Sequence, residues 1–124
     1  MSNPIPHNAA AEQEVIGGLL VWPDLTARVL DVLDESDFHV PSMARYYRAV
    51  AALHRHGKEP SSSTVVEQLA EWVQLRDSDA VDLGSAMVAA PMRSALMSSV
   101  RVVADLSTLR QIVKAGEQIV AIGL

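Results

Sequence analysis

The sequence predicts an all-α domain, and three observations lead to this prediction. Apolar residues recur at spacings of three and four, no stretch keeps the alternation of a half-buried strand, and helix start and stop signals separate the segments. At 124 residues the chain forms one compact multi-helix domain, residues 1–124, with a modest core. Because 49% of the residues are hydrophobic but only 4% are aromatic, that core must consist mainly of aliphatic side chains and Met.

The first expected helix, residues 9–21, contains a glycine pair that requires an explanation. Asn8 can accept a hydrogen bond from a free N–H group of the first turn, and Glu12 places negative charge near that turn. Gly17 and Gly18 then interrupt an apolar stripe. Since each glycine inside a helix costs about 1 kcal/mol relative to Ala, the pair indicates the close approach of another helix, and we expect the third helix to be that neighbour.

Proline, glycine and short polar residues mark the ends of the other helices. Asp24 can cap the second helix, Pro41 suits the first position of the third, and Gly57 supplies its C-terminal stop. The serines at 61–63 can cap the fourth helix, whose apolar spacing extends to Val73. The expected ranges are 24–33 for the second helix, 41–56 for the third, 80–88 for the fifth and 94–122 for a long last helix.

The long last helix carries two apolar faces. Its main stripe repeats every 3.5 residues or so, about the period of a helix that packs along another helix. One apolar face is enough for ordinary core packing, so two faces indicate a helix that also contacts something outside its domain. Packing of both faces within the domain is the alternative. The candidate subunit-interface residues on the stripe are Val102, Leu106, Leu109, Val113 and Val120.

Several short motifs resemble, in order, those of one known family. Residues 6–20, PHNAAAEQEVIGGLL, are similar to the opening of the N-terminal domain of bacterial and phage replicative DNA helicases, the DnaB family. Residues 37–41 are similar to that family's Asp-Phe-Tyr-x-Pro, with His39 in place of Tyr. Leu109 and Arg110 fall in a run that resembles the family's last N-domain helix. The resemblance extends from Pro6 to about Ile122 and is poorest over residues 72–90.

This resemblance implies a function in assembly rather than in catalysis. In the family, the last helix is the first arm of a helical hairpin that pairs subunits, and this chain ends about where the hairpin would turn. Such domains pair as a trimer of dimers, form a collar on the hexameric helicase ring, and bind primase or a helicase loader. The resemblance therefore implies a self-associating, primosome-type domain of DNA replication, located in the cytoplasm. The alternative is a stand-alone helical adaptor, for example phage-encoded, that binds a helicase or nucleic acid.

We expect no catalytic, cofactor or metal site in this segment. Gly57 and Lys58 form the only Gly-Lys pair, but the first glycine and the hydroxyl of a phosphate-binding loop are missing. ATP and magnesium are therefore expected only in a motor domain absent from this chain. His54 and His56 point in different directions on a helix and cannot bind one ion together. Without cysteine there is no disulfide framework, and no signal peptide or membrane segment is expected.

A local basic cluster contrasts with the formal net charge of −5, which argues against wholesale nucleic-acid binding. The third helix contains Arg45, Arg48 and Arg55 and no acid, next to Tyr46 and Tyr47. Arginine and aromatic side chains together can follow a phosphate backbone and stack on bases. A solvated helix face with buried tyrosines is the alternative. These three arginines are candidates for contact with nucleic acid or a protein partner, and DNA binding is expected to be weak and salt-sensitive.

Overall fold

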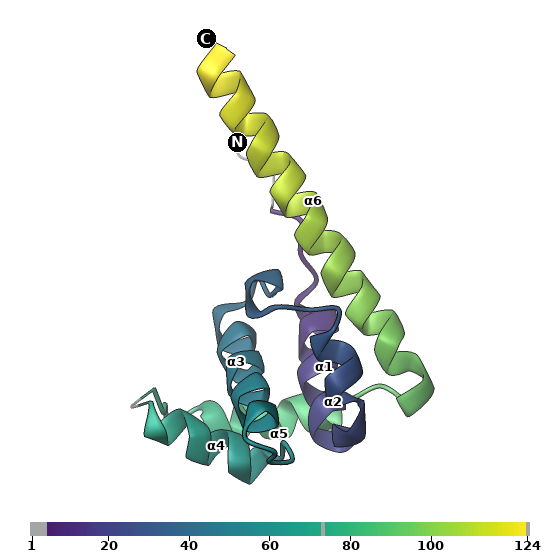
Figure 1. Cartoon of the computed structure of the whole chain (residues 1–124), viewed down its shortest axis with the longest axis vertical. Helices are drawn as coiled ribbons and strands as arrows, with labels where there is room; N and C mark the ends of the chain where they lie inside the picture. Colours follow the sequence, from purple (N-terminus) through teal and green to yellow (C-terminus); the bar gives the residue numbers. More distant parts are fainter. Residues whose placement is uncertain (1–4, 73, 124) are drawn as a thin grey trace.

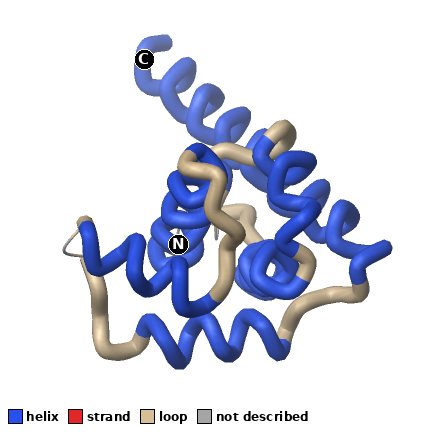
Figure 2. Tube along the Cα trace, turned by 60° about the horizontal axis from the view of Figure 1, so that its bottom comes forward, coloured by secondary structure: helices blue, strands red, loops and turns tan. Residues whose placement is uncertain are grey.

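The structure is all-helical, as the sequence predicts. The computed structural model describes residues 5–72 and 74–123, without the side chains of residues 121 and 122. Figure 1 shows the shorter helices gathered in a body from which the last helix projects, and the tube in Figure 2 shows no strand in the part it describes. The α-helices are α1 (Ala9–Val21), α2 (Thr26–Leu30), α3 (Pro41–Arg55), α4 (Ser62–Glu71), α5 (Asp79–Val88) and α6 (Leu96–Gly123). Within the described residues, 3₁₀ turns lie before α2, α3 and α6: η1 (Pro23–Leu25), η2 (Glu35–Asp37) and η3 (Arg93–Ala95).

The predicted helix boundaries hold well except for the second helix. The range 24–33 contains only the end of η1 and the five-residue α2. Asp24 lies within η1 and caps no helix; its carboxylate instead pairs with Arg93. Tyr47 donates a hydrogen bond to the Leu33 carbonyl at 2.8 Å, and its hydroxyl lies 3.4 Å from the Val29 carbonyl, so carbonyls at the end of this segment are satisfied without further helix. Val73 lies outside the described residues.

The glycine pair of α1 lies against α5 and the start of α6. A Cβ atom on Gly17 would lie 1.8 Å from the Ala86 carbonyl oxygen, a backbone atom of α5. A Cβ atom on Gly18 would lie 2.4 Å from Cδ1 of Leu96, the first residue of α6. The prediction of a close neighbour is therefore confirmed, whereas the prediction that α3 is this neighbour is wrong. Helix α1 is buried on several sides, and α3 packs on another of them.

A buried carboxylate joins α1 to the N-terminus of α3. Glu12 is only 1% exposed, and its two carboxylate oxygens accept hydrogen bonds from the backbone N–H groups of His39 at 3.0 Å and Val40 at 2.9 Å. The N-cap residue of α3 is Val40, whose side chain cannot cap. Glu12 therefore binds, from another helix, the N–H group of the N-cap residue Val40 and that of the residue before it, and so holds the backbone where it enters α3.

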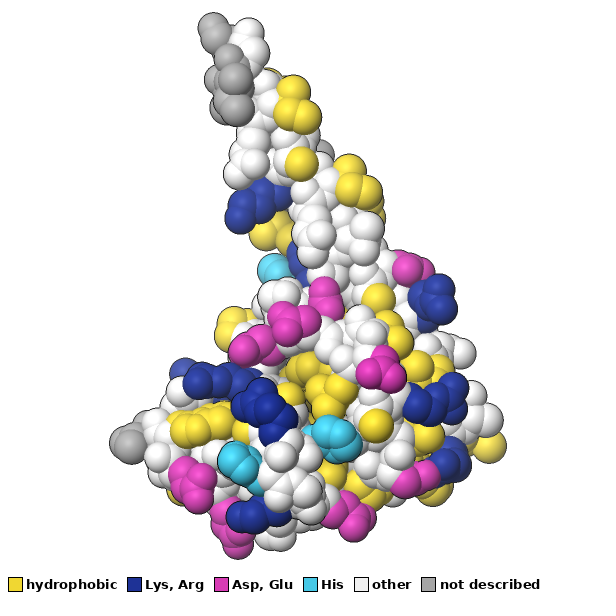
Figure 3. Space-filling view, viewed as in Figure 1, with side chains coloured by type: hydrophobic (Ala, Val, Ile, Leu, Met, Phe, Trp, Pro, Cys, Tyr) yellow, Lys and Arg dark blue, Asp and Glu magenta, His cyan; other side chains and the backbone are white. Residues whose placement is uncertain are grey.

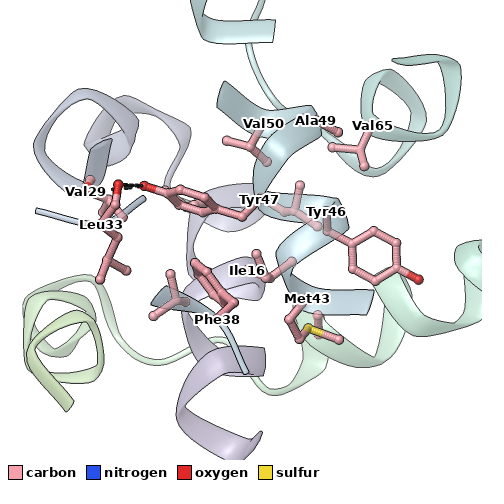
Figure 4. Close-up of a cluster of buried hydrophobic side chains, with 14 of the residues drawn as sticks. Ile16, Val29, Leu33, Phe38, Met43, Tyr46, Tyr47, Ala49, Val50 and Val65 are labelled. Atoms are coloured by element: carbon pink, nitrogen blue, oxygen red, sulfur yellow. Dashed lines mark hydrogen bonds between the residues drawn. The ribbon is translucent and has the colours of Figure 1, made fainter. Parts of the chain in front are cut away.

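Two tyrosines occupy the centre of a core that is otherwise mainly aliphatic. Tyr46 and Tyr47 are 0% and 1% exposed. The ring of Tyr47 packs against Phe38 with centroids 4.7 Å apart, while Tyr46 points in the opposite direction (Figure 4). Both hydroxyls find acceptors: Tyr47 donates to the Leu33 carbonyl and Tyr46 donates to Asp79 at 2.8 Å. The alternative considered for the third helix, a solvated face with buried tyrosines, is confirmed for the tyrosines.

These tyrosines predict a loss of stability at alkaline pH. Burial, together with hydrogen bonds to Asp79 and Asp82, raises the pKa of Tyr46 far above its usual range, and burial raises the pKa of Tyr47. Above a pH of about 10 the unfolded chain loses these protons while the folded chain keeps them. The free energy of unfolding should therefore fall with rising pH, by up to about 1.4 kcal/mol per pH unit for each tyrosine.

Urea denaturation at a series of pH values measures this slope. Tyr47→Phe should show a clearly shallower decline above a pH of about 10 than the parent chain, whatever its stability at neutral pH. A slope unchanged by that substitution would show that Tyr47 ionises equally in the folded and unfolded states.

Candidate functional site

The long helix α6 has one face in the core and extends well beyond the body. Leu96, Val100 and Val103 are 2% exposed or less and pack in the same core cluster as α1. Ser107 is the last buried residue of α6, Arg110 is half-buried, and every residue from 111 to 120 is exposed. Figure 1 shows this second half as an arm that no other described element covers. At 1.5 Å per residue, the part after Arg110 is about 20 Å long.

The predicted stripe follows the uncovered side of this helix. Leu106 is half-buried, whereas Leu109 and Val113 are 44% and 43% exposed and Val120 is 62% exposed. Val102 is also exposed, although the next residue, Val103, lies in the core. Apolar side chains are visible along the arm in Figure 3. Ile112 and Ile119 are exposed as well and add to its apolar area. Most of the stripe is therefore not used by the domain's own core.

Polar contacts hold α6 where it leaves the body. Arg110 donates from Nη1 to the Pro6 carbonyl at 2.9 Å and from Nη2 to the Asp37 carbonyl at 2.6 Å. Ser107 donates to the Asp37 carboxylate at 2.7 Å. Nearer the start of α6, Ser99 donates to Glu14 at 2.7 Å. The sequence alone predicts no such role for these residues. The one available signal was polar residues, Ser107 and Arg110, following the core-facing Val103 at helical spacing.

The structure separates the three arginines of α3. Arg45 forms a two-pronged ion pair with Asp79, with N–O distances of 3.0 and 2.7 Å, and its side chain is 11% exposed. Its guanidinium is therefore already occupied within the domain. Arg48 and Arg55 lie instead along a surface hollow of about 300 Å³, and Arg48 stacks over the Trp72 ring at 4.5 Å.

The surroundings of Arg48 and Arg55 have mixed charge. Asp34 and Glu35 line the same hollow. Hydrogen bonds from the hydroxyl and the backbone N–H of Ser36 lower the pKa of Asp34, so its negative charge persists at neutral pH. Carboxylates beside the arginines oppose the approach of a phosphate backbone. This hollow therefore suits a polar contact with a protein better than a nucleic-acid track.

The described residues present no cluster of ligands for a metal ion. Within residues 5–72 and 74–123, no group of three or more His, Asp or Glu side chains is arranged to hold one. The rings of His7 and His39 stack on each other with centroids 4.3 Å apart, while His54 and His56 are exposed at the end of α3. No helix in this part of the chain combines the length and the apolar character needed to span a membrane.

A helical body with a projecting last helix defines the class of fold, and comparison with known proteins identifies the family. Residues 4–105 match the DnaB-like helicase N terminal domain, and the chain belongs to this family. It is 31% identical over 119 residues to the replicative DNA helicase DnaB of Leifsonia xyli and 32% identical over 119 residues to that of Mycobacterium leprae. These alignments cover 95% of this chain but only 26% and 20% of those helicases, so the chain spans about a quarter of their length or less.

Solved structures show the same fold. The crystal structure of the N-terminal domain of DnaB helicase from Mycobacterium tuberculosis superposes with a TM-score of 0.92 at 31% identity, covering 97% of this chain and 86% of that one. The N-terminal domain of DnaB helicase from Helicobacter pylori, described with its interactions with primase, gives a TM-score of 0.79 at 18% identity and covers 92% and 89% of the two chains. The family and the fold predicted from the sequence are thus confirmed.

Proposed function

We propose that this chain is the non-catalytic N-terminal domain of a replicative DNA helicase and that it joins helicase subunits through the stripe on α6. The observation that carries this proposal is the exposure of Leu109, Val113 and Val120 on an arm that the body does not cover. Large apolar surfaces of this kind are seldom left in water. The family to which the chain belongs supplies the context of the helicase ring.

The energetics of the stripe fit self-association. Full burial of a Leu or Val side chain contributes about 1.5–3 kcal/mol, whereas association costs about 4–15 kcal/mol in lost motion. Because the stripe residues are already partly covered, several of them together are needed to exceed that cost. The simplest closed arrangement is a two-fold dimer in which two copies of α6 pack along each other, each stripe against its symmetry mate. Within a complete helicase such dimers would be the units of the ring.

The substitution Leu109→Asp tests this interface. It places an unpaired charge at the centre of the stripe and should convert a concentration-dependent dimer into a folded monomer. Gln111→Asp is the matched control, because Gln111 is also exposed on α6 but lies on the opposite side of the helix from Leu109. Sedimentation velocity measures the state of each chain, and circular dichroism checks that each is folded. A parent chain that stays monomeric at high micromolar concentration would exclude a stripe-mediated dimer.

We further propose that the domain binds primase or a helicase loader, as part of the primosome in the cytoplasm. The support is the shared fold with the Helicobacter pylori domain that is described with its interactions with primase. Fluorescence anisotropy of the labelled chain, titrated with the primase of the source organism, tests this. Saturable binding supports the proposal. Sub-micromolar DNA binding near physiological salt, without primase binding, would favour the stand-alone adaptor instead.

A further inference from the structure

Arg110 lies at the point where α6 stops being part of the body and becomes an arm. It is half-buried, whereas the ten residues that follow it are all exposed. Its guanidinium reaches two segments that are distant in sequence, 104 and 73 residues away. Nη1 donates to the carbonyl of Pro6 at 2.9 Å, and Nη2 donates to the carbonyl of Asp37 at 2.6 Å.

The Asp37 carbonyl is held firmly in place. The Asp37 carboxylate accepts hydrogen bonds from the Asp34 N–H group at 2.7 Å and from Ser107 at 2.7 Å, one turn before Arg110. The next residue, Phe38, is buried against Tyr47. The backbone just beyond it is held by the buried carboxylate of Glu12. An arginine bound here is therefore bound to the core and not to a free loop.

The Pro6 carbonyl is anchored in a similar way. Two residues further along, the side chain of Asn8 caps α1 by accepting a hydrogen bond from the Ala11 N–H group at 3.0 Å. Between them, the ring of His7 stacks on the ring of His39, which follows η2. The N-terminal segment and the η2 segment thus form one polar platform under α6, and Arg110 binds both.

We propose that Arg110 is a positioning residue that fixes the direction of the α6 arm relative to the body. The last residue of α6 that packs against the core cluster is Ala104, about 9 Å before Arg110. Apolar contacts along one face of a helix do not by themselves fix its angle to the body, because apolar contact is not directional. The planar guanidinium of Arg110 supplies two hydrogen-bond donors in a fixed geometry beyond the last of these apolar contacts. The fixed direction would also align the stripe for subunit pairing, and this consequence rests on the proposed function. The role of Arg110 in fixing the arm does not depend on that function.

Distances between spin labels test the proposal, and the absence of cysteine makes site-specific labelling clean. Labels are placed on Lys114→Cys in the arm and Glu67→Cys in α4, both at exposed positions. Labelled chains are mixed with an excess of unlabelled chains, so that double electron–electron resonance reports distances within one chain. The parent should give one narrow distance distribution. Arg110→Ala should broaden or shift it, whereas Arg101→Ala, which removes an exposed arginine from the same helix, should leave it unchanged.

Arg110→Lys separates geometry from charge. Lysine keeps the positive charge but loses the planar pair of donors, so this variant should resemble Arg110→Ala more than the parent. If circular dichroism shows that Arg110→Ala does not fold, the distance distribution of Arg110→Lys tests the proposal in its place. A distribution in the folded variants that is the same as in the parent would overturn the proposal. Because the distances are measured within one chain, that outcome would not contradict the proposed subunit pairing. Conversely, a parent chain that sediments as a monomer would not contradict the role of Arg110.

Discussion

Replacing Gly17 by alanine is expected to destabilise the domain, although alanine favours helices. The added Cβ atom would lie 1.8 Å from the Ala86 carbonyl oxygen and 2.5 Å from its carbonyl carbon, both backbone atoms of α5. Since backbone cannot rotate away as a side chain can, α1 and α5 would have to separate. Overpacking of this kind costs about 1–3 kcal/mol or more, against a gain in helix propensity of at most about 1 kcal/mol. Gly17→Leu should be worse than Gly17→Ala.

Two other glycines provide matched controls for this prediction. Gly84 lies within α5, and a Cβ atom added there would meet no heavy atom within 4 Å. Gly84→Ala should therefore raise the free energy of unfolding by about 0.5–1 kcal/mol. The free energy of unfolding of Gly18→Ala should lie between those of Gly17→Ala and Gly84→Ala, because its Cβ atom would meet the flexible end of the Leu96 side chain. Thermal melting followed by circular dichroism gives the order, and a higher melting temperature for Gly17→Ala would show that close approach to α5 is not required.

The glycine pair illustrates what the sequence can predict about this fold. The cost of two glycines inside a helix is local, so a close neighbour could be predicted from residues 9–21 alone. Which helix approaches depends on packing between segments about 70 residues apart, here Gly17 and Ala86, and no local signal carries that information. The prediction for the second helix was wrong for a related reason. The carbonyl of Leu33, three residues past the end of α2, accepts a hydrogen bond from the hydroxyl of Tyr47, which belongs to α3.

In the candidate site, too, one feature could be predicted from the sequence and others could not. The stripe on α6 could be predicted because a repeat along one helix is written in one stretch of sequence, and the exposure of Leu109 and Val113 agrees with a surface role. The contacts of Arg110 could not be predicted, because its acceptors are backbone carbonyls, which every residue carries. From the sequence, Arg45 belongs to a basic cluster on the third helix. Its partner, Asp79, lies 34 residues away, so no local signal links the two residues.

The network around Arg45 leads to the second large expected effect, a strong destabilisation by Asp79→Asn. Asp79 is 1% exposed and pairs through both carboxylate oxygens with Arg45. It also accepts hydrogen bonds from the Tyr46 hydroxyl at 2.8 Å and from the Arg76 N–H group at 2.7 Å, which fixes the start of α5. The asparagine keeps the size of the side chain but leaves the Arg45 charge buried without compensation. Breaking one side of such a pair costs about 3–5 kcal/mol.

The exposed pair between Arg93 and Asp24 is the natural control for this prediction. Its side chains are 50% and 60% exposed, so water screens the attraction and can solvate whichever charge remains. Arg93→Ala should therefore leave the urea midpoint within error of the parent, whereas Asp79→Asn should lower it strongly with little change in the denaturant slope. Equal midpoints for the two variants would mean that the Arg45 guanidinium finds other partners or water when Asp79 is changed.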